Sequence, residues 1–138
     1  MFRKILVAFD GSDPTRKMFD VALDLAGKYQ SEIHVLAVAQ PPQFPEEVET
    51  RAVVEDAQER LERQFGSLKT RAAYAGMTPH FRIRVGHPAE QIVRDAEEHT
   101  IELILLGHRG RGVFEWWQHS SISRKVITYA HCAVMIVR

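Results

Sequence analysis

The sequence predicts an α/β fold: a single domain with one mostly parallel sheet and helices on both faces of that sheet. Two observations carry this prediction. Short apolar runs alternate with longer amphipathic segments along the whole chain, and strict alternation of strand and helix is typical of parallel sheets. No internal repeat or linker interrupts the alternation, so one domain is expected to span residues 1–138.

Five segments have the character of strands: residues 4–10, 32–39, 80–85, 101–106 and 133–137. The first and fourth are almost wholly apolar, as expected of strands that are covered on both faces. The third alternates apolar with charged side chains, which suits a half-exposed edge strand. The fifth carries neither charge nor proline, the usual protection of an edge, and a bare edge favours pairing with another chain. We therefore expect a homodimer joined through residues 133–137.

Four segments between these strands have the periodicity of helices. The first begins after Pro14, where a turn signal supplies candidate N-caps. The second follows the proline-rich stretch 40–47 and stops at Gly76. The third is expected over residues 88–99 and the fourth over about 119–130.

Composition excludes several classes of function. Lys and Arg number 18 and Asp and Glu number 18, so no global positive field exists to hold nucleic acid or an anionic membrane. No apolar run approaches the roughly 20 residues of a membrane span, and the start has no signal-peptide pattern. The single cysteine, Cys132, excludes an internal disulfide. These features are typical of a cytoplasmic protein.

Unusual chemistry follows the first and fourth strands. Asp10, Gly11 and Ser12 end the first, and Gly-His-Arg-Gly (107–110) ends the fourth. Ligands of open parallel sheets bind beyond the carboxyl ends of the strands, where connections diverge to opposite faces. If these two strands are neighbours, their loops form one crevice. The seven histidines show no metal-ligand spacing, and only His108 is placed by its loop to meet a ligand.

Standard phosphate and hydrolase motifs are missing from the glycine loop. A P-loop needs a lysine and a hydroxyl where Val113 and Phe114 stand. The patterns GxGxxG, GxSxG and HExxH are also missing. Glycines nevertheless let backbone N–H groups approach a phosphate, and the start of a serine-rich helix at 120–123 would add positive charge. Two interpretations stay open on composition: a phosphate cradle, or a solvated loop whose serines cap a helix.

At this point the chain resembles the universal stress protein family over nearly its whole length. "KILVAFDGS" (4–12) is similar to that family's first strand. "VGHPAEQIVRDAEEHTIELILLGHRGRG" (85–112) is similar to its third-helix and fourth-strand signature, and "SSISRKVITYAHCAVMIVR" (120–138) to its closing helix and strand.

The nucleotide-binding branch of that family has a glycine, two residues, a second glycine, nine residues, then glycine and a serine or threonine. Gly107, Gly110 and Ser121 keep this spacing, but Ser120 stands where the family has glycine. If that position has positive φ, a Cβ there costs about 1–2 kcal/mol. If this whole cost opposed nucleotide binding, the affinity would fall roughly ten- to thirtyfold.

The resemblance implies a Rossmann-like, three-layer α/β/α domain with five parallel strands in the order 3-2-1-4-5, and a dimer through the fifth strand. It implies a site for ATP or another adenine nucleotide, with or without Mg²⁺. Adenine and ribose would meet the first two strands, and ribose and phosphates the fourth strand, the loop and the serines. The residues implied are Ala8, Phe9, Asp10, Val38, Leu106, Gly107, His108, Arg109, Gly110, Ser120, Ser121, Ile122 and Ser123.

The expected function is a dimeric stress-response sensor or regulator that binds an adenine nucleotide and hydrolyses ATP slowly at most. One alternative is a nucleotide-free regulatory dimer whose site Ser120 has impaired. An enzyme of a related nucleotide-binding class is the third, but the SGGxDS and HxGH motifs that it needs are missing. Trp116 and Trp117 would point about 100° apart on a helix. An exposed tryptophan there would indicate a surface for an unknown regulatory protein partner.

Overall fold

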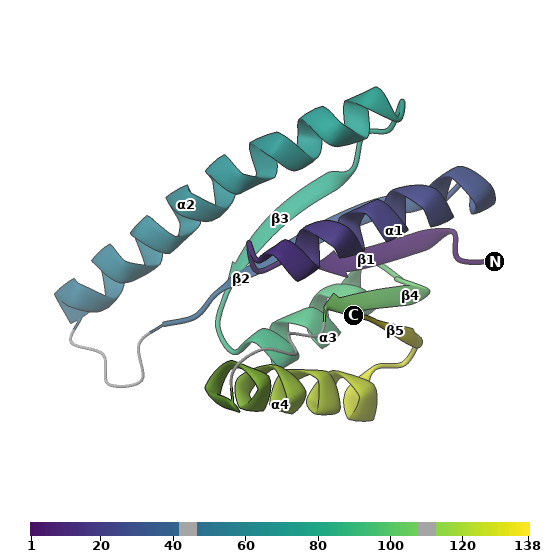
Figure 1. Cartoon of the computed structure of the whole chain (residues 1–138). Helices are drawn as coiled ribbons and strands as arrows, with labels where there is room; N and C mark the ends of the chain where they lie inside the picture. The colour runs from purple at the N-terminus through teal and green to yellow at the C-terminus, as the bar shows by residue number, and fades with distance from the viewer. Residues whose placement is uncertain (42–46, 108–112) are drawn as a thin grey trace.

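The computed structural model is a parallel five-stranded sheet with helices on both faces (Figure 1). It describes residues 1–41, 47–107 and 113–138, and their side chains outside 42–49 and 108–120. The elements in chain order are β1 (Lys4–Ala8), α1 (Asp13–Tyr29), β2 (Glu32–Ala39), α2 (Glu47–Tyr74), β3 (His80–Val85), α3 (Pro88–Glu98), β4 (Leu103–Gly107), α4 (Val113–Tyr129) and β5 (Ala133–Val137).

The strands lie in the order β3-β2-β1-β4-β5 and all neighbouring pairs are parallel. This confirms the three-layer fold and the predicted strand order. β1 pairs with β2 on one side and with β4 on the other. The connection after β1 and the connection after β4 diverge to opposite faces of the sheet, so the crevice between their carboxyl ends is the place where such sheets bind ligands.

Alternate strand residues divide the core into two halves. One half packs the sheet against α1 and α2 and is centred on Ile5, Val7 and Phe19. The other packs it against α3 and α4 and includes Leu6 and Ile104. Because both faces of β1 and β4 are covered, these strands are apolar at every buried position, as their sequences predict.

Several element boundaries differ from the sequence prediction, and the first strand, expected over 4–10, ends at Ala8. The fourth helix begins at Val113 instead of about residue 119, so the serines at 120–123 lie inside α4 and do not cap it. The fourth strand runs from Leu103 to Gly107 instead of 101–106. Its start is delayed because the amide of Ile101 donates to the carbonyl of Ala96 and so completes the end of α3.

β3 and β5 are the two edges of the sheet. β3 is half-buried along most of its length, as its alternating sequence predicts. β5 is also only partly covered, and pairing of this edge with a second copy stays a prediction. Within the described part of the chain, no helix is both long and apolar enough to cross a membrane.

Candidate functional site

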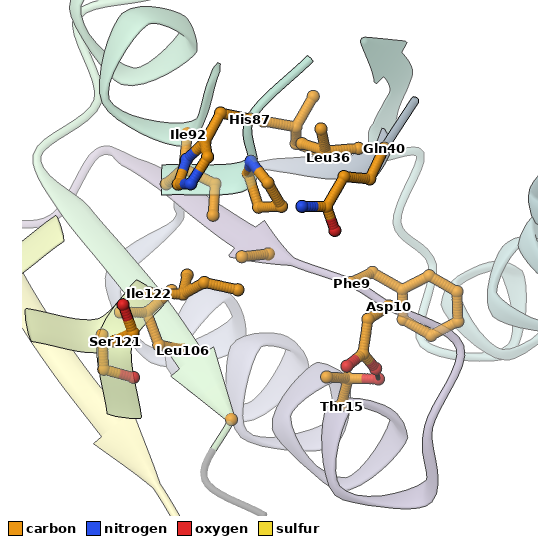
Figure 2. Close-up of a pocket in the computed structure, with 15 residues that line it drawn as sticks. Phe9, Asp10, Thr15, Leu36, Gln40, His87, Ile92, Leu106, Ser121 and Ile122 are labelled. Carbon is orange, nitrogen blue, oxygen red and sulfur yellow. Dashed lines mark hydrogen bonds between the residues drawn. The ribbon is translucent and has the colours of Figure 1, made fainter. Parts of the chain in front are cut away.

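A cavity of about 400 Å³ lies at the carboxyl ends of β1, β2 and β4, bordered by the start of α3 and the middle of α4 (Figure 2). Its position is the switch point of the sheet, where the crevice was expected. The lining residues are Ala8, Phe9, Asp10, Thr15, Leu36, Val38, Gln40, His87, Pro88, Ile92, Leu106, Gly107, Ser121, Ile122 and Ser123.

Most of the expected site residues come together around this cavity. They come from β1 and the residues directly after it, and from β2, β4 and α4: Ala8, Phe9, Asp10, Val38, Leu106, Gly107, Ser121, Ile122 and Ser123. His108, Arg109 and Gly110 lie outside the described residues, as does the side chain of Ser120. The side chains of Trp116 and Trp117 also lie outside them.

Several lining residues were missed by sequence reasoning. Leu36, Val38 and Gln40 all face the cavity because side chains two apart on a strand share one face. That periodicity was readable from the sequence once Val38 had been placed. His87 also lines the cavity, which corrects the expectation that only His108 among the histidines could meet a ligand. The remaining additions are Thr15, Pro88 and Ile92.

The cavity wall combines apolar side chains with polar groups at its edges, and His87 and Gln40 lie on the same side as Ile92 and Leu36 (Figure 2). Leu36 and Ile92 face Leu106 and Ile122 across the cavity, and these apolar side chains leave room for a flat ring (Figure 2). Asp10 and Thr15 form a polar region beside Phe9, while Ser121 lies at the α4 side (Figure 2). A ligand with an apolar ring and several hydroxyl or phosphate oxygens would suit this mixture of apolar and polar side chains.

The loop after β1 holds Asp10 by local hydrogen bonds. The amide of Ser12 donates to Asp10 Oδ1 at 2.9 Å, and Thr15 Oγ1 lies 3.1 Å from the same oxygen. Gly11 has φ +86°, a conformation that a residue with a side chain rarely adopts. The Asp-Gly-Ser sequence therefore builds a tight turn that places the carboxylate at the rim of the cavity.

The serines contribute differently from the expectation. Since α4 begins at Val113, Ser121 and Ser123 lie more than a turn inside the helix, where backbone N–H groups are already used within it. The positive end of the helix dipole is therefore not at these serines. Their contribution to a bound anion would come from the hydroxyl groups of their side chains.

A second polar cluster lies at the start of β2 and β3, at the opposite end of the strands. Nε2 of His34 lies 2.6 Å from Oε1 of Glu32, and Nε2 of His80 lies 3.2 Å from the same oxygen. The ligand atoms of these three residues all lie within 4.8 Å of one another. Sequence spacing did not predict this group, because His34 and His80 meet only through the β2–β3 register.

Arg82 determines the tautomer of His34 in this cluster. Its guanidinium is held by the buried carboxylate of Asp95 through contacts of 3.0 and 2.6 Å, and its Nη1 donates to Nδ1 of His34 at 2.8 Å. A neutral imidazole whose Nδ1 accepts must carry its proton on Nε2, which here donates to Glu32. Burial lowers the pKa of His34, which favours this neutral form. As arranged, Nε2 offers no lone pair to a metal ion.

Comparisons with known proteins agree with one another on a family. The model of the universal stress protein family matches residues 1–138. The universal stress protein YxiE of Bacillus subtilis is 32% identical over 153 residues, with 100% of both chains covered.

Solved structures show the same fold. The universal stress protein UspA of Lactobacillus plantarum has a TM-score of 0.81 at 24% identity, covering 99% of this chain and 98% of its own. A universal stress protein family protein of Arabidopsis thaliana, solved with AMP bound, has a TM-score of 0.71 at 17% identity and covers 97% and 90%.

Proposed function

Because the chain belongs to the universal stress protein family, we propose that it binds an adenine nucleotide in the cavity at the ends of β1, β2 and β4. We further propose that nucleotide occupancy makes it a stress-response sensor or regulator. The observation that carries this proposal is one cavity whose wall combines apolar side chains with the carboxylate of Asp10 and the hydroxyls of Ser121 and Ser123. Its volume of about 400 Å³ lies in the range of small-molecule sites.

The proposed ligand would lie across the cavity in one direction. The adenine would lie among the apolar side chains of the cavity, beside Val38, and the ribose hydroxyls would donate to the Asp10 carboxylate. The phosphates would extend past Gly107 toward the hydroxyls of Ser121 and Ser123. His108, Arg109, Gly110 and Ser120 would complete the phosphate side. Mg²⁺ would enter with ATP, since this ion is often held by the phosphates of its ligand.

The function proposed is regulatory and not catalytic, with slow ATP hydrolysis at most. The protein would act in the cytoplasm as a homodimer joined through residues 133–137, and an unidentified regulatory protein would read its nucleotide state. The bare edge of β5 supports the dimer, because none of its five residues is buried: three are half-buried and two are exposed.

In the first test, the protein is purified without added nucleotide and then denatured. The supernatant is chromatographed to detect any nucleotide that the protein has released. Thermal-shift titrations with ATP, ADP, AMP and cyclic AMP follow on the native protein. We expect a shift at millimolar ligand, because ligand that binds only the folded state stabilises it. No released nucleotide and no shift would refute the proposal and favour a nucleotide-free regulator.

A matched pair of variants locates the site. Asp10→Asn removes the carboxylate charge at the cavity rim and should weaken binding at least tenfold, since hydrogen bonds to charged groups contribute about 1.5–3 kcal/mol. Asp56→Asn makes the same change on the exposed surface of α2 and should bind as the parent does. Equal affinities in all three proteins would place the ligand elsewhere.

A further inference from the structure

Thr15 lies between the two segments that supply the proposed site, the loop after β1 and the end of β4. It lies in the first turn of α1, yet its side chain is only 5% exposed and lines the cavity. Its hydroxyl faces the loop after β1, and its methyl group faces the end of β4. The loop supplies the carboxylate of Asp10, and β4 supplies Gly107, the first glycine of the motif. Thr15 therefore contacts both of these residues.

The hydroxyl belongs to the hydrogen bonds that hold Asp10. Thr15 Oγ1 lies 3.1 Å from Asp10 Oδ1, 2.8 Å from the carbonyl of Ser12 and 3.3 Å from Ser12 Oγ. The single hydroxyl proton is shared between the carboxylate and the Ser12 carbonyl, so the hydroxyl lies between the carboxylate and the turn that carries it. Removing the hydroxyl would leave the Ser12 amide still donating to Oδ1.

The methyl group of Thr15 limits the space for a side chain at residue 107. A Cβ built on Gly107 would lie 3.2 Å from Thr15 Cγ2, tighter than ordinary van der Waals contact. The next atoms, Thr15 N at 3.7 Å and the Pro14 carbonyl carbon at 3.8 Å, lie at ordinary distances. Gly107 is not among the described glycines with positive φ, so its backbone conformation does not itself require glycine.

We propose that Thr15 is a positioning residue of the nucleotide site, which sets the carboxylate of Asp10 with its hydroxyl and the approach of Gly107 with its methyl group. On this view the first glycine of the motif is required by Thr15, with no contact to phosphate needed to explain it. The inference rests on the proposed function. It adds a residue that acts on the nucleotide through Asp10 and Gly107 and not by direct contact.

Two substitutions separate the two roles. Thr15→Val keeps the methyl group and the shape but removes the hydroxyl; Thr15→Ser keeps the hydroxyl but removes the methyl group. Affinities for AMP, 2′-deoxy-AMP and 3′-deoxy-AMP are measured by calorimetry for both variants and the parent. A ribose hydroxyl that donates to Asp10 should make the parent prefer AMP over one deoxy analogue by about tenfold.

Thr15→Val should reduce that preference by about three- to tenfold, because the carboxylate loses one of its local donors. Thr15→Ser should keep the preference. A general loss of stability would weaken all three ligands equally and leave their ratio unchanged. A parent that binds none of them contradicts the proposed function and this inference together. A parent that shows the preference and a Thr15→Val variant that keeps it overturn this inference alone.

The contact with Gly107 is tested without any ligand. Gly107→Ala should lower the melting temperature by a few degrees, and the double variant Thr15→Ser with Gly107→Ala should recover most of the loss, because the atom 3.2 Å away is gone. Gly66→Ala is the control, since a Cβ there would meet nothing within 4 Å. Additive losses in the double variant would show that Thr15 does not determine the glycine.

Discussion

Asp95 is a charged side chain with no exposed surface, on the inner face of α3. Arg82 contacts both of its carboxylate oxygens, and Arg84 lies 3.3 Å from Oδ2. Both arginines belong to the edge strand β3. A buried carboxylate is tolerated only when its charge is paired and its oxygens are hydrogen-bonded. Asp95 therefore attaches the edge strand to the helix whose first turn lines the cavity.

Replacing this carboxylate should be costly. Asp95→Ala leaves two arginines that are only 23% exposed without their shared partner, and removing one member of a buried pair costs about 3–5 kcal/mol. Glu98→Gln is the control, because Glu98 pairs with Arg84 at a half-exposed position where an ion pair contributes at most about 1 kcal/mol. Urea unfolding of both variants measures the difference. Equal losses of unfolding free energy in the two variants would mean that Asp95 contributes no more to stability than an exposed ion pair.

Some residues of the site could be predicted from the sequence and others could not. Asp10 and Gly107 were identifiable because each directly follows an apolar strand and breaks its pattern. Thr15 was not, because its significance comes from two contacts, one with a residue five positions away and one with a residue on a different strand. A side chain that acts between elements leaves no pattern within its own element.

The bounds of some helices and strands were likewise predictable from the sequence, and those of others were not. The strands at 32–39, 80–85 and 133–137 match their predicted bounds because alternation and turn residues delimit them. The start of α4 was predicted six residues too late. Glycines at 107, 110 and 112 indicated a loop, and the run of bulky residues after them showed no clear apolar stripe. Helical propensity alone is a weak signal in such a stretch.

The contact between β2 and β3 should make stability depend on pH. His34 is faced by Glu32 on its own strand, by His80 and Arg82 on β3, and by His99 at the end of α3, whose ring centroid lies 5.6 Å away. Burial is the main cause that lowers the pKa of His34, against the opposing hydrogen bond to Glu32. The hydrogen bond from His34 is the main cause that lowers the pKa of Glu32.

Both shifts act in the same direction. Since the pKa of His34 is lower in the folded state, the unfolded chain takes up the proton first as the pH falls below about 6.5. The stability is therefore complete above the usual histidine pKa and is lost as the pH falls through the folded-state pKa. Glu32 adds a further loss below its ordinary pKa of 4.5. His34→Gln should flatten the decline by at most about 1.4 kcal/mol per pH unit.

Urea unfolding between pH 7.5 and 5 checks this expectation. His131→Gln is the matched control, because His131 is exposed beyond the end of α4 and pairs with Glu97 at the surface. It should leave the slope of the parent unchanged. An identical slope in His34→Gln would assign the acid sensitivity to other groups.

At the scale of the molecule, the alternation of strands and helices predicted a parallel sheet but not the order of its strands. Periodicity reports which face of an element is buried and says nothing about which strand lies beside it. The order 3-2-1-4-5 came from resemblance to a family, and the structure confirms it. This order brings Asp10 and Gly107 to one cavity, and it also leaves β5 at an edge.

The exposed edge of β5 favours a homodimer. Met135 packs against the core on the α1 side and would disturb the fold if charged, whereas Ile136 is 36% exposed. Ile136→Lys therefore places a charge on the proposed interface with little effect on the core, and charged edges resist pairing. The parent should run in light-scattering chromatography at twice the chain mass of 15.8 kDa, and the variant at that mass itself. Val53→Lys is the control, since Val53 is 48% exposed on α2, which lies toward the β3 side of the sheet (Figure 1). A parent that runs as a monomer would contradict the dimer, and a dimer that survives Ile136→Lys would place its interface on another face.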